Sequence, residues 1–487
     1  MSMNPKKTIF IPIASNTACR NIFYHPDGVF SILKRSRPDI FFVILVLKKE
    51  HDKYTKLLGE GLGTRFTIEP VYVPSASTFA QKLFHFFYSY LLYTKSTVVL
   101  ATMGTRPGEP PAGGRKYLAP LKWLIARTIG RSEYVRLRIV PRLFQKIFTD
   151  RPFKNLFDRY QPSLVFSTHI YGWFDTMLLA EAKRRGITTV GMPAGWDHLD
   201  KYYLPFHTDR LLAQSNEIIK AAVTYQSYRK EQIRLTGYPY FDYFVRRSYQ
   251  MPRVKLLDEL HLPPDAHYIL YVSGTDYCPD EPDVIEAMAQ WIEKKELPVT
   301  TYLVIRPYPG GAQRGKAYDR QRFAKLEQHP RIRFCWQKTW ADLQETDFFL
   351  NVMLYADVVM QVYTTVALEV TALDRPILST LFDGYRILPF RESIRRFEKF
   401  EHFQDVIRTG ALAQAHGFDE LKTFLNRFLA DPDYLRKERN LMKKELCGPL
   451  DGKSSERIAK ALIDMMTTSP GDKAFSTHTH RVVNPPH

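Results

Sequence analysis

The chain has 487 residues, of which 45% are apolar and 14% aromatic, and its formal net charge is +18. This composition excludes an intrinsically disordered protein, and the length exceeds what one ordinary core needs, so two domains are expected. The four cysteines lie far apart without a C-x-x-C pair, which argues against a disulfide framework and a zinc site. No secretory leader precedes the first apolar segment, so we expect a cytoplasmic protein.

Strand-like and helical patterns alternate in the first part of the chain, which favours an α/β fold with parallel sheets. Residues 7–15 form the first predicted strand, a helical pattern extends to Arg37, and residues 40–48 form the second strand. After an irregular region, further strands are predicted at 163–169, 188–194, 210–215 and 233–239. This half of the chain is therefore predicted to be one α/β unit.

The irregular region, residues 78–160, combines aromatic and basic side chains and is predicted to be a helical insertion with a Pro/Gly loop at 104–114. Residues 112–160 carry 12 Lys/Arg against three Asp/Glu. Such a basic amphipathic segment is typical of contact with anionic lipid, although packed helices with a solvated basic face fit equally well. No nucleic-acid-binding motif accompanies it. The longest apolar run, residues 83–93, is shorter than the roughly 20 residues that cross a bilayer.

A second series of strands and helices follows residue 246. Two such units, meeting near residues 240–265, would leave a cleft between them. Amphipathic helices come next, and the polar end of the chain is predicted to be disordered. We therefore expect domains at 1–245 and 246–466 and a tail at 467–487. The strands of the second unit are predicted at 268–275, 301–311, 332–336, 357–362 and 375–382.

Two adjacent threonines, Thr364 and Thr365, separate the strand at 357–362 from the next helix. Ligands of open parallel sheets bind beyond the carboxyl ends of the strands, and a helix N-terminus offers N–H groups to phosphate. The two hydroxyls therefore predict a phosphate site, although threonine also commonly caps a helix. Glu369, about one turn further on, does not suit phosphate but suits the hydroxyls of a ribose.

Basic and titratable side chains follow other strands in the same way. Arg306 ends the strand that begins at residue 301, where a guanidinium suits phosphate oxygens and a departing diphosphate, or an ordinary surface ion pair. His169 and His198 lie at the ends of neighbouring strands of the first unit. Either imidazole suits proton removal from an attacking hydroxyl. Asp197 is expected to orient the ring of His198 or to act as the base itself.

Several common signatures are missing from the sequence. There is no Walker loop and no early G-x-G-x-x-G fingerprint, so an ATPase or a dehydrogenase has little support. A D-x-D triplet occurs at 431–433, but it separates two predicted helices and indicates a helix start. We therefore expect neither a metal ion nor a cofactor.

Five segments follow one another in a fixed order: TVGMPAGWDHLDK, RLTGYPYFDYF, LVIRPYPGG, YADVVMQVYTTVALEVTALDRPIL and GPLDGKSSERIAKALI. This series, which covers about residues 160–466, resembles the GT-B superfamily of nucleotide-dependent transferases. Within it, the likeness is to bacterial surface-polysaccharide glycosyltransferases and to the CDP-glycerol glycerophosphotransferases of teichoic acid synthesis. The first 160 residues match only in their general α/β plan.

The resemblance implies two Rossmann-like domains whose parallel sheets face each other across a cleft, with the donor on the second domain and the acceptor on the first. It implies a metal-independent glycosyltransferase that moves a sugar from a nucleotide diphosphate sugar to a hydroxyl of a cell-surface polysaccharide or lipid-linked glycan. The protein would then lie at the inner face of the membrane, held by residues 112–160. The expected catalytic residues are His198 and Asp197, which together would deprotonate the acceptor, and His169. The expected donor-binding residues are Arg306, Thr364, Thr365, Glu369, Gly237, Ser273 and Gly274.

Two departures from the pattern bear on the activity. The chain reads W-D-H at 196–198 where the glycerophosphotransferases read W-H-G, and Tyr308 replaces a histidine before the second proline. These changes favour sugar transfer over phosphoglycerol transfer, which stays an alternative. The non-hydrolysing UDP-N-acetylglucosamine 2-epimerases share the fold and an element like TGYP, but VYTT replaces their Gly-rich turn, so an isomerase is a further alternative. The last alternative is a non-catalytic protein that binds polyanions or membranes.

Overall fold

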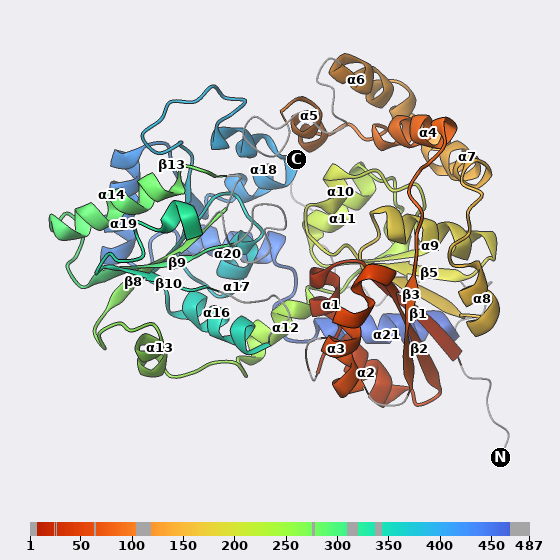
Figure 1. Ribbon diagram of the computed structural model, residues 1–487, viewed down its shortest axis with the longest axis horizontal. Coiled ribbons are helices and arrows are strands. Elements are labelled where there is room, and N and C mark those ends of the chain that lie inside the picture. Colours follow the sequence, from red (N-terminus) through yellow and green to blue (C-terminus); the bar gives the residue numbers. More distant parts are fainter. Residues whose placement is uncertain are drawn as a thin grey trace.

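The computed structural model describes residues 7–23, 25, 27–62, 65–103, 118–274, 278–308, 320–336 and 343–467. These residues form two α/β domains, each built around one parallel sheet (Figure 1). The predicted loop at 104–114 and the predicted tail beyond Thr467 lie outside the described residues. The predicted α/β class with two parallel sheets is confirmed.

The first sheet has seven parallel strands in the order β3-β2-β1-β4-β5-β6-β7. Strand β2 is apolar throughout, as is typical of a parallel sheet covered on both faces. The sequence pattern does not predict β3, because FTIEPV contains a glutamate and a proline and lies half-buried at the sheet edge. The strands are β1 Lys7–Ile13, β2 Ile40–Leu47, β3 Phe66–Val71, β4 Leu164–Ser167, β5 Thr188–Gly191, β6 Arg210–Ala213 and β7 Ile233–Leu235.

The second sheet has six parallel strands in the order β10-β9-β8-β11-β12-β13. Its five predicted strands are present, and β13 is an addition at the edge. The sequence LAQA of β13 lacks the β-branched and aromatic residues that indicate a strand. The strands are β8 His267–Val272, β9 Thr301–Arg306, β10 Ile332–Phe334, β11 Val358–Gln361, β12 Ile377–Thr380 and β13 Leu412–Ala415.

Helices cover both faces of each sheet. In β1, Ile9 packs into one hydrophobic cluster and Phe10 into another, because successive side chains of a strand point to opposite faces. Outside the insertion the helices are α1 Asn16–Phe23, α2 Val29–Ser36, η1 Lys48–Glu50, α3 His51–Leu62, α9 Trp173–Arg184, α10 His198–Lys201, α11 Asn216–Thr224, η5 Lys230–Gln232, α12 Pro239–Arg246, α13 Arg253–Glu259, α14 Glu281–Glu293, α16 Leu343–Tyr355, α17 Val366–Ala372, η7 Ile394–Lys399, α18 Glu401–Arg408, α19 Phe418–Ala430, α20 Arg436–Leu446 and α21 Ser454–Thr467.

The predicted helical insertion between β3 and β4 is confirmed where the chain is described. Phe84 and Phe144 attach it to the first domain, since both belong to a hydrophobic cluster of the first sheet. No described helix is long and apolar enough to span a membrane. The helices are α4 Phe79–Ser89, α5 Lys95–Thr102, α6 Ala119–Arg127, η3 Ile129–Arg131, η4 Val135–Ile139, α7 Val140–Ile147 and α8 Lys154–Tyr160.

The last helix, α21, returns to the first domain. Its residues Ile458 and Leu462 are buried in the same cluster as Ile9 of β1. The carboxylate of Asp242 on α12 accepts hydrogen bonds from the first backbone N–H groups of α21, at Ser454 (2.8 Å) and Ser455 (2.7 Å). The chain therefore crosses between the domains twice. The predicted division at residue 245 has only one crossing and assigns α21 to the second domain.

Candidate functional site

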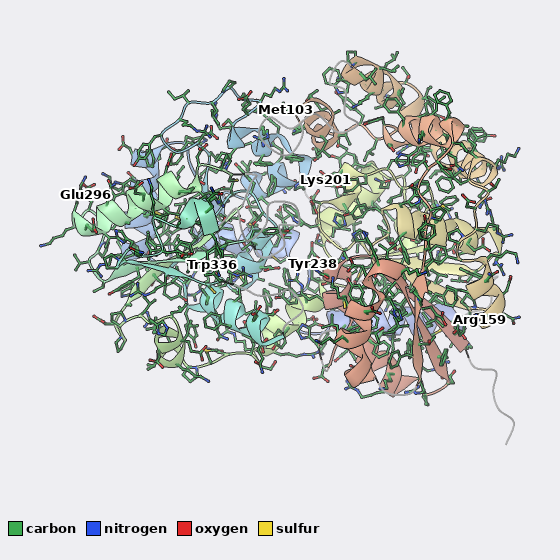
Figure 2. The ribbon with its side chains drawn as sticks, in the orientation of Figure 1. Met103, Arg159, Lys201, Tyr238, Glu296 and Trp336 are labelled. Atoms are coloured by element: carbon green, nitrogen blue, oxygen red, sulfur yellow. The ribbon has the colours of Figure 1, made fainter. Side chains whose placement is uncertain are left out.

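A cavity of about 540 Å³ lies between the two domains. Its size falls in the range of roughly 300–1,000 Å³ that is typical of small-molecule sites. Strand order reverses between β1 and β4 in one sheet and between β8 and β11 in the other, and segments that follow these strands line the cavity. Such switch points are where open parallel sheets bind ligands. Figure 2 labels Tyr238, a lining residue, where the domains meet.

Eight of the ten candidate residues line this cavity. The structure therefore brings together side chains that the sequence analysis assigned to opposite domains. The first domain contributes His169, Asp197 and His198, and the second contributes Ser273, Arg306, Thr364, Thr365 and Glu369. Gly237 and Gly274 are not among the lining residues.

Arg306 is a buried cation at the end of β9, with only 2% of its surface exposed. Its Nη1 donates a hydrogen bond to the backbone oxygen of Pro307 at 2.6 Å. The guanidinium carbon lies 4.5 Å from the ring centre of Phe349, which is a cation–π distance. Burial lowers the pKa of Arg306, but a guanidinium stays protonated at neutral pH. The cavity thus has a fixed positive charge in its wall.

Thr364 and Thr365 lie between β11 and α17, and their environments differ. The Thr364 hydroxyl donates a hydrogen bond to Oε1 of Gln361 at 2.5 Å, and its backbone N–H donates to the same oxygen at 3.2 Å. Thr365 is exposed and occupies the N-cap position of α17 without a side-chain capping bond. The hydroxyl of Thr365 is therefore the more accessible of the two for a ligand in the cavity.

Glu369 on α17 contacts the first domain. Its Oε1 accepts a hydrogen bond from Nη2 of Arg20, on α1, at 3.3 Å. The guanidinium carbon of Arg20 lies 3.6 Å from the ring centre of Tyr240, so the two groups stack. Burial raises the pKa of Glu369, while the positive charges of Arg20 and Arg306 oppose this shift. An ion pair therefore joins the two walls of the cavity.

His169 follows β4, and its tautomer is set by the backbone. Its Nδ1 lies 2.9 Å from the carbonyl oxygen of Tyr171, which only accepts hydrogen bonds. The Nδ1 nitrogen must therefore carry the proton, and the neutral ring has its basic lone pair on Nε2. The ring stacks on Tyr171, with ring centres 4.0 Å apart. These contacts orient an imidazole that can accept a proton at Nε2.

His198, at the start of α10, has the opposite tautomer. Its Nδ1 accepts a hydrogen bond from the backbone N–H of Gly195 at 3.2 Å, which leaves the proton of the neutral ring on Nε2. Burial lowers the pKa of His198 to about 3, although the charge of Asp197 opposes this shift. The ring is therefore neutral at physiological pH and donates from Nε2.

Asp197 is already paired in the structure. Its Oδ2 accepts a hydrogen bond from Nζ of Lys201, and its Oδ1 lies 3.7 Å from Nε2 of His198. Burial would raise the pKa of Asp197, but the charge of Lys201 and its hydrogen bond hold it well below its usual value. The carboxylate is thus occupied by Lys201, and both roles expected of Asp197, orientation of His198 and proton removal, stay predictions.

A buried polar network ties α10 to the second domain. Oδ2 of Asp200 lies 2.9 Å from Nδ1 of His402 on α18, and it also accepts a hydrogen bond from the hydroxyl of Ser96. The Ser96 hydroxyl accepts a hydrogen bond from the backbone N–H of Glu401 at 2.9 Å. The helix that carries His198 is thus fixed relative to both domains.

Three candidates remain, namely Ser273, which lines the cavity, and Gly274 and Gly237, which do not. All three contact other residues of the protein. The Ser273 hydroxyl donates to Oε2 of Glu281 at 2.8 Å, and the N–H of Gly274 donates to Oε1 of the same residue at 2.7 Å. Gly237 has φ +89°, and a Cβ there would lie 2.3 Å from Oγ of Ser454 at the start of α21. Gly237 and Gly274, predicted to bind the donor, therefore have structural positions outside the cavity.

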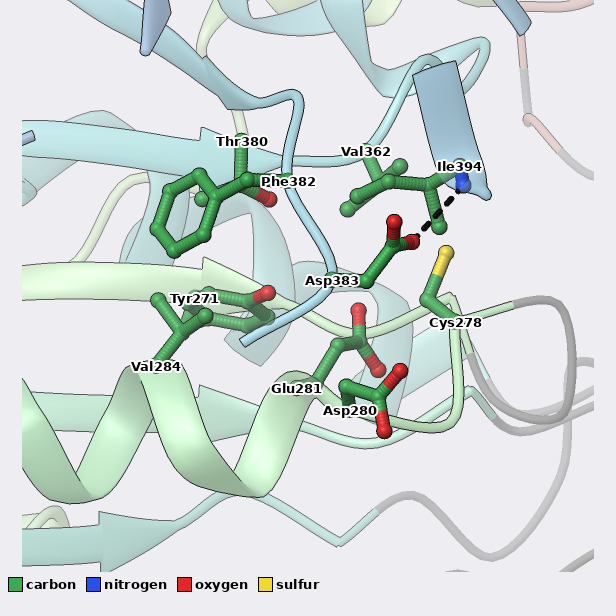
Figure 3. Close-up of a pocket in the computed structure, with 10 residues that line it drawn as sticks. All are labelled: Tyr271, Cys278, Asp280, Glu281, Val284, Val362, Thr380, Phe382, Asp383 and Ile394. Atoms are coloured by element: carbon green, nitrogen blue, oxygen red, sulfur yellow. Dashed lines mark hydrogen bonds between the residues drawn. The ribbon is translucent and has the colours of Figure 1, made fainter. Parts of the chain in front are cut away.

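A second cavity of about 10 Å³ lies inside the second domain, near the start of α14 (Figure 3). Asp383 and Cys278 belong to its lining, and Oδ1 of Asp383 accepts a hydrogen bond from the backbone N–H of Ile394 at 2.9 Å. This space holds at most about one water molecule. It is therefore too small for a substrate.

The sequence analysis missed Arg20, Tyr171 and Tyr240 as parts of the site. Arg20 and Tyr171 follow β1 and β4, so the rule that selected the other candidates would have found both. Tyr240 lies on α12 between the domains, where no local pattern indicates it. Among the described residues, no group of three or more His, Cys, Asp or Glu side chains is placed to hold a metal ion.

No protein-family model and no curated protein matches the sequence. Solved structures do match the fold. A putative UDP-N-acetylglucosamine 2-epimerase from Listeria monocytogenes aligns with TM-score 0.52 and 13% identity over 96% of this chain and 99% of its own. The UDP-GlcNAc 2-epimerase from Neisseria meningitidis, bound to UDP-GlcNAc, gives 0.52 and 11% over 94% and 100%. A glycosyltransferase from Rickettsia africae gives 0.50 and 9% over 96% and 100%.

These identities are low, so the likeness concerns the fold and not the reaction. It extends over nearly the whole of each chain, including the first 160 residues, where the sequence shows only a general plan. Two parallel sheets of seven and six strands, with a ligand-sized cavity at the carboxyl ends of both, agree with it. The chain therefore has a two-domain α/β fold of the GT-B type, the fold that it shares with these epimerases and this glycosyltransferase.

Proposed function

We propose that the protein is a glycosyltransferase that moves a sugar from a nucleotide diphosphate sugar to a hydroxyl of a cell-surface polysaccharide or lipid-linked glycan. One observation carries the proposal. A single cavity has a buried guanidinium, Arg306, in its second-domain wall and an imidazole with a basic Nε2, His169, in its first-domain wall. In sugar transfer, a cation would face the departing diphosphate and a base would face the attacking hydroxyl.

The second-domain wall suits the donor. Arg306 would stabilise the negative charge that develops on the departing diphosphate, and Thr365 with the N-terminus of α17 would donate hydrogen bonds to its oxygens. Glu369 would accept hydrogen bonds from the ribose hydroxyls. The Neisseria protein of the same fold is bound to UDP-GlcNAc. This supports a nucleotide sugar as the donor class.

The first-domain wall suits the acceptor. The acceptor oxygen would attack the anomeric carbon, the bond from that carbon to the diphosphate oxygen would break, and the hydroxyl proton would move to Nε2 of His169. His198, which is neutral and donates from Nε2, would hold the acceptor or the sugar by a hydrogen bond. This assignment gives the role of base to His169, since His198 carries its proton on the nitrogen opposite its bond to Gly195.

The helical insertion suits an anionic membrane surface. Among the residues that the structure describes, half of the exposed large apolar side chains lie within residues 72–143, among the bases of this region. Basic residues around exposed apolar ones favour attachment to anionic lipid headgroups, which would bring the cavity to lipid-linked acceptors. The exposed apolar residues are Tyr72, Phe79, Leu83, Tyr93, Leu121, Leu124, Ile129, Tyr134 and Leu143.

A donor panel tests the activity. The protein is incubated with UDP-, GDP- and CMP-sugars and with CDP-glycerol, with and without a lipid-linked glycan fraction, while released nucleotide and the transferred group are measured. Sugar transfer with nucleotide release supports the proposal. Glycerophosphate transfer, or a change of sugar configuration without release, would instead establish one of the alternative activities. If no nucleotide diphosphate raises the melting temperature, the cavity does not bind donors and the proposal fails.

Vesicle flotation tests the membrane surface. The protein should float with anionic vesicles at low salt, less at high salt, and not with neutral vesicles. Replacing both Phe79 and Leu124 by serine should reduce flotation, whereas Leu441→Ser, an exposed leucine on α20 of the second domain, should not. Flotation that is independent of lipid charge and of these residues would leave the insertion with a structural role only.

A further inference from the structure

Arg20 is the only lysine or arginine that the first domain contributes to the described lining of the large cavity. It lies on α1, beyond the carboxyl end of β1, and the second domain contributes Arg306 to the same cavity. The side chain of Arg20 is 20% exposed, so it is reachable from the cavity yet largely shielded from water. Two guanidinium groups from different domains therefore line one ligand-sized space.

The contacts of Arg20 orient it but use little of its hydrogen-bonding capacity. Stacking on Tyr240 fixes the plane of the guanidinium, with 3.6 Å between its carbon and the ring centre. Nη2 makes one long hydrogen bond of 3.3 Å to Glu369, and the buried Nε has no hydrogen-bond partner among the described residues. A guanidinium has five N–H donors in a planar fork that suits phosphate oxygens.

We propose that Arg20 is a ligand for the diphosphate of the donor and that donor binding exchanges its partner, from the Glu369 carboxylate to phosphate oxygens. The inference rests on the proposed function, since it concerns the same donor. Glu369 is thereby released to accept hydrogen bonds from the ribose. The ion pair between the walls serves to hold both side chains in place until the nucleotide arrives.

The exchange has a consequence for the two domains. The diphosphate would lie on the second domain, near Arg306 and α17, and Arg20 belongs to the first domain. Bonds from Arg20 to phosphate would therefore join the domains through the ligand, in place of the direct bond between Arg20 and Glu369. Nucleoside diphosphates would use this contact, and nucleosides without phosphate would not.

The test compares Arg20→Gln with the wild-type protein by titration calorimetry. The ligands are UDP, GDP, CDP and ADP, and the nucleoside that corresponds to the diphosphate that binds best. Arg20→Gln should weaken diphosphate binding about 10- to 100-fold, because charge-assisted hydrogen bonds are lost. The ratio of diphosphate to nucleoside affinity should fall by a similar factor. This ratio separates phosphate contact from an indirect effect through Glu369, which would weaken both ligands alike.

Two further variants complete the experiment. Arg20→Lys, which keeps the charge but loses the fork, should give an intermediate ratio. Arg35→Gln should leave binding unchanged, because this exposed arginine pairs with Asp27 on the surface. An unchanged ratio in a folded Arg20→Gln protein overturns the inference alone. Failure of the wild-type protein to bind any of the four diphosphates overturns the proposed function itself.

Discussion

The two walls of the cavity differ in their chemistry. The second-domain wall carries Arg306, Thr365 and Glu369, which are groups for charged oxygens and hydroxyls. The first-domain wall carries two imidazoles with opposite tautomers, and burial lowers the pKa of His198 to about 3, so that ring is neutral at physiological pH. Groups for anion binding and groups for proton transfer therefore come from separate folding units. Only the packing of the two domains sets the distance between them.

The largest effect is expected when the proposed base of the first-domain wall is removed. His169→Gln should lower turnover about 10²- to 10⁴-fold, because a positioned base contributes on that scale. His416→Gln, an exposed histidine of the second domain, is the matched control and should retain full activity. A folded His169→Gln variant that keeps the wild-type rate would remove His169 from the mechanism.

The opposite wall is tested at Arg306. Arg306→Ala should lower turnover about 10²- to 10³-fold, because a preorganised positive charge no longer faces the leaving diphosphate. The melting temperature is measured in parallel, since the side chain is buried. Arg333→Ala on β10 removes a guanidinium outside the cavity lining that donates hydrogen bonds to backbone oxygens, and it should keep the activity. Near-normal donor turnover in a folded Arg306→Ala protein would contradict the assignment.

A variant at Gly237 tests whether this residue serves the stability of the fold or the binding of the donor. Gly237→Ala should destabilise the protein by about 1–3 kcal/mol, because alanine is strained at φ +89° and its Cβ would collide with Ser454. Donor affinity of the folded variant should stay the same. Gly59→Ala on α3, where a Cβ meets nothing within 4 Å, should be neutral or slightly stabilising. A loss of nucleotide affinity without a loss of stability would return Gly237 to the binding site. Denaturant unfolding and calorimetry give the two quantities.

A smaller effect should appear in the dependence of stability on pH. Burial, with the charges of Arg20 and Arg246, lowers the pKa of His25 to about 4. The unfolded chain takes up this proton near pH 6.5 and the folded chain only near pH 4, so His25 lowers stability as pH falls through this window. His25→Phe, which keeps a ring against Tyr243, should therefore lose less in melting temperature between pH 7 and 4.5 than the wild-type protein. Equal losses would mean that His25 does not titrate as described.

Most of the strands in both sheets can be predicted from the sequence, because their apolar runs are long and bounded by turn residues. The two strands that were not predicted, β3 and β13, lack such apolar runs. β3 contains Glu69 and Pro70 at a half-buried edge, and β13 has the sequence LAQA. At sheet edges, pairing with a neighbouring strand replaces the local apolar signal.

The candidate site could be predicted as a set of strand ends but not as a set of contacts. The rule about carboxyl ends placed His169, His198 and Arg306 at the cavity, because parallel strands end at one edge of a sheet. The same rule gave no means to see that Gly237 lies under α21, since that contact joins residues more than 200 positions apart. The rule also did not show that the carboxylate of Asp197 accepts a hydrogen bond from Lys201.

The sequence by itself determined the alternation of strands and helices, the presence of two parallel sheets and the positions of most functional groups along the chain. These depend on local periodicity and on which residue follows a strand. The tertiary structure alone decided the return of α21 to the first domain and the pairing of Arg20 with Glu369. That pair joins residues 349 positions apart, and their distance depends on how two separately folded sheets pack.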